Sequence, residues 1–222
     1  MNGGDGSRES ASVPVVLVHG LWMTGLELTL VARRVRRCGF VPRRFRYRSL
    51  GRPVSENAVR LARFVTDLGE PTVHLVGHSL GGLVILRALG EQPQLPAGRV
   101  VLLGTPVAGS GVAKRLGATA AGRMLLGRSL QQGLDGAGQI RPTGRQVGVI
   151  AGTTGMGVGR LVGGLAQPSD GTVAVAETRL PGAAGCTVAA THMGLVLSRE
   201  AAQQVCRFLT LGEFADGDRP AE

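Results

Sequence analysis

Short apolar runs alternate along the chain with stretches in which apolar residues recur at helical spacing. Wholly apolar runs suit strands that are buried on both faces of a parallel sheet. The alternation predicts an α/β protein with an open, mostly parallel sheet and helices on both faces. The predicted strands are Val13–Val18, Val41–Tyr47, a run that ends at Gly77, Arg99–Leu103, Val147–Ala151, a short Val173–Ala176 and Thr187–Ala190.

Helices are expected where the apolar positions fall on one side and a capping residue or glycine marks an end. The first has Leu28 and Val35 on one side and arginines on the other. The run Leu80–Leu89 is apolar nearly all round, which predicts a helix buried inside the fold. Ser55 and Ser198 can cap two further helices.

The same pattern predicts one domain with two polar ends. Residues 13–210 carry the alternation, residues 1–12 are expected to be a disordered leader, and residues 211–222 a loose polar tail. Residues 107–146 interrupt the alternation, since they form a long segment rich in glycine and arginine. This segment could cover the active edge of the sheet as a lid or cap, or it could be one crossover helix with loops. The sequence favours neither.

Composition limits the class of protein. A hydrophobic fraction of 43% in 222 residues is enough for one folded core. No apolar run reaches the roughly 18 residues of a membrane-spanning helix, and no secretion signal is visible at the start. The cytoplasm is therefore the expected location. Cys38, Cys186 and Cys206 are odd in number and widely spaced, so neither a disulfide framework nor a zinc site is expected.

The net charge of +10 is unevenly distributed. Eleven arginines and a single acid, Glu56, lie between Arg33 and Arg63. Two interpretations remain open: a solvated face, or a basic face that associates weakly with anionic lipid or an anionic substrate. No nucleic-acid-binding motif accompanies the arginines, so specific recognition of nucleic acid is not expected.

Residues 155–160 resemble part of a dinucleotide-binding fingerprint. However, Arg160 stands where the pattern G-x-G-x-x-G requires glycine, and no acidic residue follows at the expected distance in a strand–helix–strand unit. The segment is therefore interpreted as a flexible loop, and neither a cofactor nor a metal is expected.

The stretch Gly77-His78-Ser79-Leu80-Gly81 matches the G-x-S-x-G pattern of a nucleophile elbow. It stands between an apolar run and an apolar helix, which is the strand–turn–helix context that the pattern requires. A sharp turn there exposes the serine hydroxyl, and the flanking glycines remove Cβ atoms that would collide where strand and helix cross. The alternative is an ordinary glycine-rich turn. The context favours Ser79 as a candidate nucleophile.

A serine nucleophile needs a base, and the base needs an acid that orients it. His192 follows the last predicted strand, so it is expected at the same edge of the sheet as Ser79. The acid should come between them in the chain. Asp170 lies in a turn signature and is the preferred candidate, with Glu177 in reserve.

Backbone N–H groups can stabilise the charge that develops on an attacked carbonyl oxygen. Leu80, at the start of the elbow helix, is one candidate donor, and Leu21, in the loop after the first strand, is the other. The residues expected to line a substrate pocket are apolar and lie in that loop or in the candidate lid: Trp22, Met23, Leu125 and Leu130.

Five blocks of the chain resemble successive motifs of the α/β-hydrolase superfamily, and in particular small bacterial lipases and esterases with a G-H-S-L-G-G elbow. The blocks are Val18–Trp22, Gly77–Gly82, Gly104–Pro106, Ser169–Val173 and Thr191–Met193. The resemblance implies an α/β-hydrolase fold and a triad of Ser79, Asp170 and His192 that acts on carboxylic esters without a cofactor. The calcium ligands and secretion signal of those lipases have no clear counterpart here.

Three functions are compatible with these residues. The first is hydrolysis of a small-molecule or lipid ester through an acyl-enzyme. The second is a thioesterase or amidase, because the same machinery serves all three bonds. The third is a catalytically silent binding protein, against which the intact set of serine, acid and histidine argues. Nothing in the sequence indicates an oligomeric state.

Overall fold

The computed structural model describes residues 13–126, 144–157 and 165–215. Within these ranges, six strands form one parallel sheet in the order β2-β1-β3-β4-β5-β6. The parallel sheet predicted from the apolar runs is therefore confirmed. The strands are β1 (Pro14–Val18), β2 (Val41–Phe45), β3 (His74–His78), β4 (Val100–Leu103), β5 (Val147–Gly152) and β6 (Ala184–Val188).

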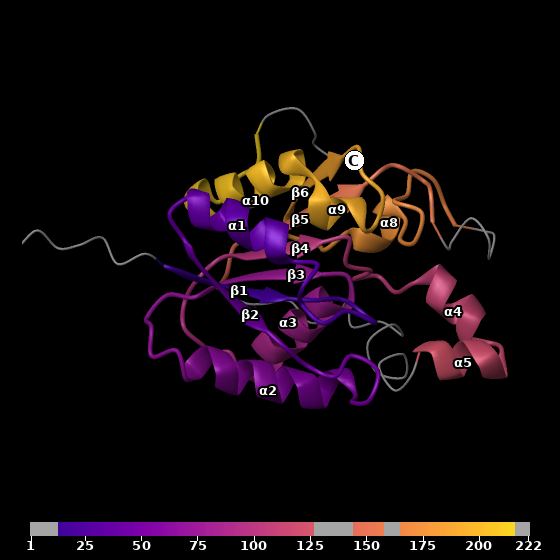
Figure 1. Ribbon diagram of the computed structural model, residues 1–222, viewed down its shortest axis with the longest axis horizontal. Coiled ribbons are helices and arrows are strands. Elements are labelled where there is room, and N and C mark those ends of the chain that lie inside the picture. Colours follow the sequence, from indigo (N-terminus) through magenta and orange to yellow (C-terminus); the bar gives the residue numbers. More distant parts are fainter. Residues whose placement is uncertain (1–12, 127–143, 158–164, 216–222) are drawn as a thin grey trace, which may run out of the picture.

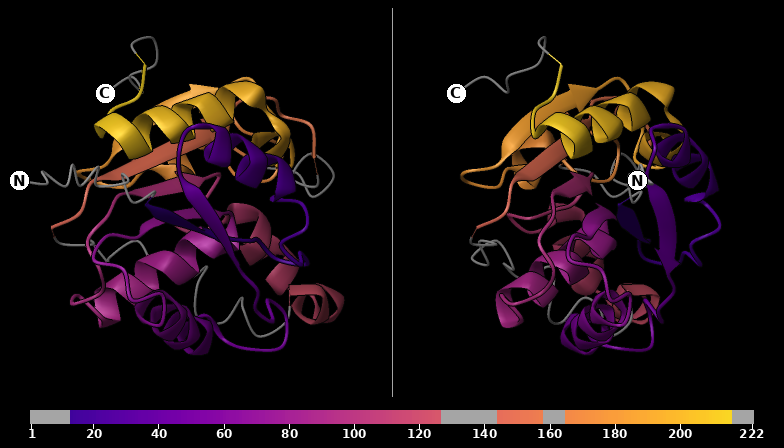
Figure 2. Two further views of the ribbon diagram at one scale, coloured as in Figure 1. Left: turned by 60° about the vertical axis from the view of Figure 1, so that its left-hand side comes forward. Right: turned by 90° about the vertical axis from the view of Figure 1, so that its left-hand side faces the viewer.

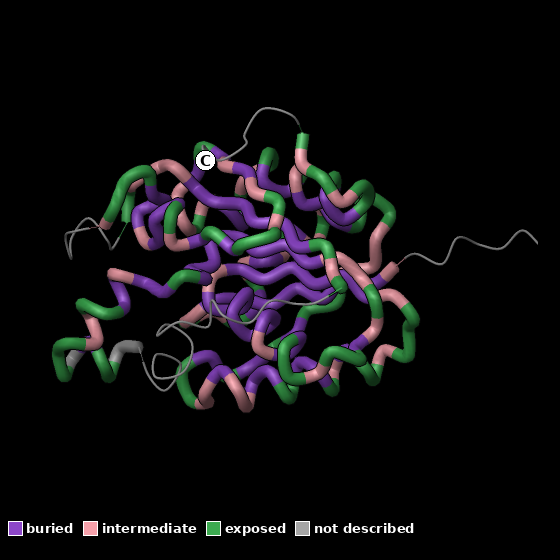
Figure 3. Tube along the Cα trace, turned by 180° about the vertical axis from the view of Figure 1, so that it is seen from behind, coloured by how far each residue is buried: buried purple, intermediate pink, exposed green. Residues whose placement is uncertain are grey.

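Helices cover both faces of the sheet, as expected (Figures 1 and 2). One face carries α1 (Thr29–Arg37), α9 (Gly194–Leu197) and α10 (Arg199–Leu211), and the other carries α2 (Val54–Thr66) and α3 (Leu80–Glu91). Alternate residues of β1 enter the two apolar cores, with Leu17 in the first and Val16 in the second. The four inner strands and the inner sides of the helices are buried, whereas the outer sides of the helices are exposed (Figure 3).

The segment after β4 departs from this layered arrangement. Its helices α4 (Gly111–Gly117) and α5 (Ala120–Leu126) stand beyond the strand ends (Figure 1). We call residues 111–126 the α4–α5 hairpin. The Ser110 side chain caps α4 by accepting a hydrogen bond of 3.1 Å from the Ala113 N–H. Among the described elements, α4 packs chiefly on α5.

Two predicted strands differ from the structure. Val173–Ala176 forms no strand, because the chain turns there into the short helix α8 (Val175–Thr178), whose first turn is held by the Glu177 carboxylate. The last strand is Ala184–Val188 rather than Thr187–Ala190. Small residues in β6 hid it from the apolar pattern, yet they pair in register with β5 from Gly148 to Gly152.

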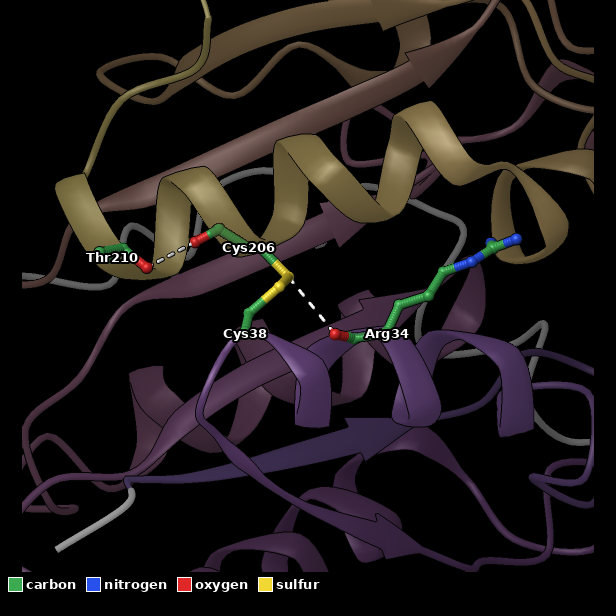
Figure 4. Close-up of a disulfide and its surroundings, with 4 residues drawn as sticks. All are labelled: Arg34, Cys38, Cys206 and Thr210. Atoms are coloured by element: carbon green, nitrogen blue, oxygen red, sulfur yellow. Dashed lines mark hydrogen bonds between the residues drawn. A yellow bond between two sulfur atoms is a disulfide. The ribbon is translucent and has the colours of Figure 1, made fainter.

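The expectation that the cysteines form no disulfide is wrong. Cys38, directly after α1, is bonded to Cys206 in α10, with 6.2 Å between their Cα atoms (Figure 4). The two helices lie side by side on one face of the sheet, although 168 positions separate the cysteines. Spacing along the chain therefore carried no signal for this bond. Cys186 is buried in β6 and takes no part in a disulfide.

β2 forms one edge of the sheet. Arg43 and Arg44 on β2 are exposed, as are Arg33, Arg36 and Arg37 on α1. No helix within the described ranges is long and apolar enough to cross a membrane.

Candidate active site

Ser79 occupies the sharp turn between β3 and α3. Its φ of 52° and ψ of −123° lie in a region that L-residues rarely adopt, so the turn stores backbone strain. A Cβ at Gly77 would lie 2.6 Å from the Gly82 nitrogen, and one at Gly81 would lie 2.5 Å from the His19 carbonyl oxygen. Strand and helix can therefore cross this closely only with glycine at both positions. A strained serine in a tight strand–turn–helix crossing is the geometry that a nucleophile elbow would require.

Asp170 and His192 meet at the same edge of the sheet. The Nδ1 of His192 lies 2.6 Å from Oδ2 of Asp170, a carboxylate that is only 1% exposed. The other oxygen, Oδ1, accepts hydrogen bonds from the N–H groups of Thr172 (2.8 Å) and Val173 (2.7 Å). The backbone N–H of His192 in turn donates to the Asp170 carbonyl at 2.9 Å. We call residues 168–174 the acid loop. The hydrogen bonds within this loop and to His192 hold the Asp170–His192 pair in position.

Gly104, at the end of β4, makes room for this pair. Its φ is +55°, and a Cβ built there would lie 3.1 Å from both Oδ2 of Asp170 and Nδ1 of His192. Any side chain at this position would push on the hydrogen bond between them. The glycine at the start of the Gly-Thr-Pro block is therefore required for steric reasons at the site.

Ser79 and His192 open into one pocket of about 490 Å³. Trp22 and Met23 line this pocket beside Ser79, where the sequence placed them. Of the other two expected lining residues, Leu130 and the side chain of Leu125 lie outside the described part of the chain. Sequence reasoning missed several lining residues, which come from α4, the loop after β5 and the turn before α9: Val112, Ala113, Leu116, Met156 and Met193. These residues lie in short segments flanked by glycine, which show no helical periodicity. The one sequence signal that could have indicated α4 is Ser110, a residue type that caps helices.

Leu21 and Leu80, the predicted N–H donors, both line the pocket. Nδ1 of His19 lies 2.9 Å from the Gly20 carbonyl oxygen, which can only accept, so Nδ1 carries the proton. In a trans peptide the C=O and the following N–H point in opposite directions. The Leu21 N–H therefore points away from His19, and within the described chain it finds no acceptor. The Tyr47 hydroxyl fixes the same loop by donating to the His19 carbonyl at 2.7 Å.

His78 connects the elbow to the loop that carries His192. Its Nε2 donates to the His192 carbonyl at 3.1 Å, and the two rings lie 4.8 Å apart. Complete burial, and secondarily the neighbouring His192, lowers the pKa of His78 to about 3. His78 is therefore neutral at ordinary pH and adds no positive charge beside His192. Burial also lowers the pKa of His19.

Glu177, the reserve acid, does not contact His192. Its carboxylate accepts hydrogen bonds from the N–H of Gly111 at 2.6 Å and from that of Ala174 at 2.9 Å. The structure thus brings Ser79, Asp170 and His192 to one edge and places Glu177 against α4. Among the residues that the structure describes, no cluster of histidine, cysteine or acidic side chains could hold a metal ion.

A parallel sheet with helices on both faces fits the α/β-hydrolase fold. A sequence model of the alpha/beta hydrolase family matches residues 15–220, and the chain belongs to that family. No curated protein matches the chain by sequence.

Solved structures share the fold at low sequence identity. The Bacillus licheniformis lipase BlEst2 in its mature form is 21% identical, with a TM-score of 0.72 over 91% of this chain and 93% of that one. The metagenomic carboxyl esterase MGS0156 is 19% identical, with a TM-score of 0.64 over 82% of this chain and 65% of that one. The Bacillus subtilis carboxylesterase CesB is 16% identical, with a TM-score of 0.57 over 92% and 86%.

Proposed function

We propose that the protein hydrolyses carboxylic esters through an acyl-enzyme on Ser79. The observation that carries the proposal is the 2.6 Å contact between Asp170 and His192, beside a pocket that His192 shares with Ser79. An ionised Asp170 holds the proton of His192 on Nδ1, which leaves Nε2 free to act as a base. Leu21 and Leu80, whose N–H groups are the candidate oxyanion donors, line the same pocket.

The reaction follows from these positions. The Ser79 hydroxyl oxygen attacks the ester carbonyl carbon while Nε2 of His192 takes its proton. The carbonyl electron pair moves to oxygen, and the N–H groups of Leu21 and Leu80 bind the resulting oxyanion. The carbonyl re-forms, the bond to the alcohol breaks, and His192 returns the proton to the alcohol. Water then attacks the acyl-enzyme by the same route, which releases the acid and restores Ser79.

The pocket supports esters with an apolar acyl chain, from small molecules or lipids. Its volume of about 490 Å³ is lined mainly by apolar side chains. The structural neighbours, a lipase and two carboxylesterases, agree with such substrates. A thioesterase or amidase would use the same steps, but no feature of the described pocket favours either one. A binding protein without activity would not need a hydrogen-bonded acid–histidine pair.

The experiment combines covalent labelling with a substrate series. A fluorophosphonate should label Ser79, and p-nitrophenyl esters from acetate to octanoate should be hydrolysed. Labelling at Ser79 without turnover of any ester, but with turnover of thioesters or amides, would transfer the proposal to those substrates. A folded protein that is neither labelled nor active would be a silent member of the family.

Two further expectations concern location and partners. The exposed arginines of α1 and β2 leave weak binding to anionic lipid as a prediction, which salt-sensitive sedimentation with anionic vesicles would test. The cytoplasmic location also stays a prediction. The Cys38–Cys206 bond argues against it, because disulfides persist in oxidising compartments. Thiol titration of protein from its own cell would find one thiol in an oxidising compartment and three in a reducing one.

A further inference from the structure

The α4–α5 hairpin supplies one wall of the pocket. Val112, Ala113 and Leu116, all from α4, line the cavity that holds Ser79. The hairpin stands beyond the strand ends instead of packing on a face of the sheet (Figures 1 and 2). The position of this wall therefore depends on the burial of Ala113 in the core and on the few hydrogen bonds that connect the start of α4 to the rest of the fold.

A single residue makes several of those bonds. Oε1 of Glu177 accepts from the Gly111 N–H at 2.6 Å, at the first residue of α4. Oε2 accepts from the Ala174 N–H at 2.9 Å, at the start of α8. The backbone carbonyl of Glu177 accepts from the Ala108 N–H at 2.9 Å. One half-buried carboxylate thus joins the starts of two helices, where negative charge is favourable.

The acid loop does not need Glu177 to hold Asp170. Oδ1 of Asp170 is bound by Thr172 and Val173, and Oδ2 lies against His192. Loss of the Glu177 side chain would therefore leave the acid–histidine pair in place and release α4. The reacting atoms would be unchanged, whereas the apolar wall would move.

We propose that Glu177 is a positioning residue that determines acyl-chain selectivity by fastening the α4 wall of the pocket to the acid loop. This inference rests on the proposed ester hydrolysis. A long acyl chain packs along Val112 and Leu116, so its binding depends on where α4 lies. An acetyl group is too short to use that wall, so its turnover depends on the serine, acid and histidine alone.

Glu177→Gln is the first test, because the amide keeps the shape but can accept at only one of the two N–H groups. The ratio of kcat/KM for octanoate to that for acetate should fall by about tenfold, mostly through KM for octanoate, as expected when apolar pocket contacts are lost. Turnover of acetate should stay within about twofold of wild type. Glu91→Gln, the same change in an exposed helical ion pair with Arg87, should leave the ratio unaltered.

Gly111→Pro tests the same bond from its other end. Proline has no N–H, and it is favoured at the first position of a helix, so α4 should persist while its bond to Glu177 is lost. Ser110 before it is already extended, with φ −118° and ψ 114°, as a residue before proline must be. The selectivity ratio should fall as in Glu177→Gln. Gly111→Ala keeps the N–H, but its Cβ would lie 3.1 Å from Oε1 of Glu177, so its ratio should fall between those of wild type and Gly111→Pro.

Hydrogen–deuterium exchange separates failure of this inference from failure of the proposed function. Amides of α4 should exchange faster in Glu177→Gln than in wild type, whereas those of Thr172 and Val173, which donate to Asp170, should not. This readout needs no substrate, so it stands even if wild type hydrolyses no ester. Equal losses on acetate and octanoate, an unchanged ratio, or unchanged exchange of α4 would each overturn the role of Glu177.

Discussion

The acid loop and the α4–α5 hairpin both border the same pocket, but they are held in different ways. Asp170 is buried, and each of its carboxylate oxygens and both of its backbone groups have partners within the acid loop or on His192. The hairpin stands outside the layers and is joined to the body by the burial of Ala113 in the core and by the bond of Glu177 to Gly111. The two carboxylates lie close together in the chain but contact different parts of the pocket. Asp170 contacts His192, and Glu177 contacts the first residue of α4.

This difference teaches where changes should be tolerated. An over-determined loop keeps its geometry after the loss of one bond, whereas a segment with few bonds moves. Substitutions in the acid loop or at His192 should therefore alter the rate on every ester, and substitutions at the hairpin should alter the selectivity between esters. The following experiments could break or sharpen that division.

The largest effect is expected for Ser79→Ala. Loss of the nucleophile should lower kcat by roughly a millionfold on acetate and octanoate alike, because the residual rate comes only from binding and the oxyanion donors. Steady-state kinetics on both esters, with circular dichroism to confirm folding, provides the measurement. A well-folded Ser79→Ala protein that retained near wild-type turnover would contradict the serine mechanism.

Asp170→Asn should lower kcat by about four orders of magnitude at neutral pH, because the amide stabilises the wrong tautomer of His192. On acetate, Glu177→Gln should lose little by comparison. Both variants replace a carboxylate with a neutral amide at positions close together in the chain. The ratio of their kcat values on acetate therefore measures how far the roles of the acid loop and the hairpin differ. If Glu177→Gln proved the more damaging on acetate, the acid would have been assigned to the wrong carboxylate.

His19→Leu should lower kcat by about 100-fold, the usual effect of losing one oxyanion donor, with little change in KM. The reason is that Nδ1–H of His19 holds the Gly20 carbonyl and so turns the Leu21 N–H away from it. His19→Asn, whose amide N–H can replace Nδ1–H, should recover much of the rate. Binding of a trifluoromethyl ketone should weaken in parallel with kcat, and a change confined to KM would refute this role.

The smallest effect concerns the acid stability of the folded sheet. Burial lowers the pKa of His78 to about 3 and that of His74 to about 4, from an ordinary value of 6.5. Below 6.5 the unfolded chain therefore binds more protons than the folded one, and stability falls as pH decreases toward 4. The melting temperature should decline between pH 7 and pH 4.5. In His74→Gln the decline should be shallower, and an identical slope would assign the effect to other groups.

The sequence predicted what depends on local pattern and on chain order. Buried strands can be identified as apolar runs, and Ser79 and Asp170 lie in turns whose residue types are specific. His192 could be placed because parallel strands all end at one edge. These features need no knowledge of distant contacts.

What the sequence missed depends on neighbours that are far away in the chain. The role of Glu177 requires α4 and α8 to lie together, and the apolar run of Val173–Ala176 became a turn and helix because carboxylates cap it from both sides. The wall residue Leu116 belongs to a helix too short to show periodicity. The pairing of Cys38 with Cys206 follows only from the contact between α1 and α10.

That pairing makes most of the chain topologically a ring. Residues 38–206 form a closed covalent loop that contains all but the first strand and first helix, and only the two ends of the chain lie outside it. A single protease cut anywhere inside the loop leaves one connected molecule, whereas the same cut after reduction gives two pieces. The protein can thus be nicked within this loop and still migrate as one band until its disulfide is opened.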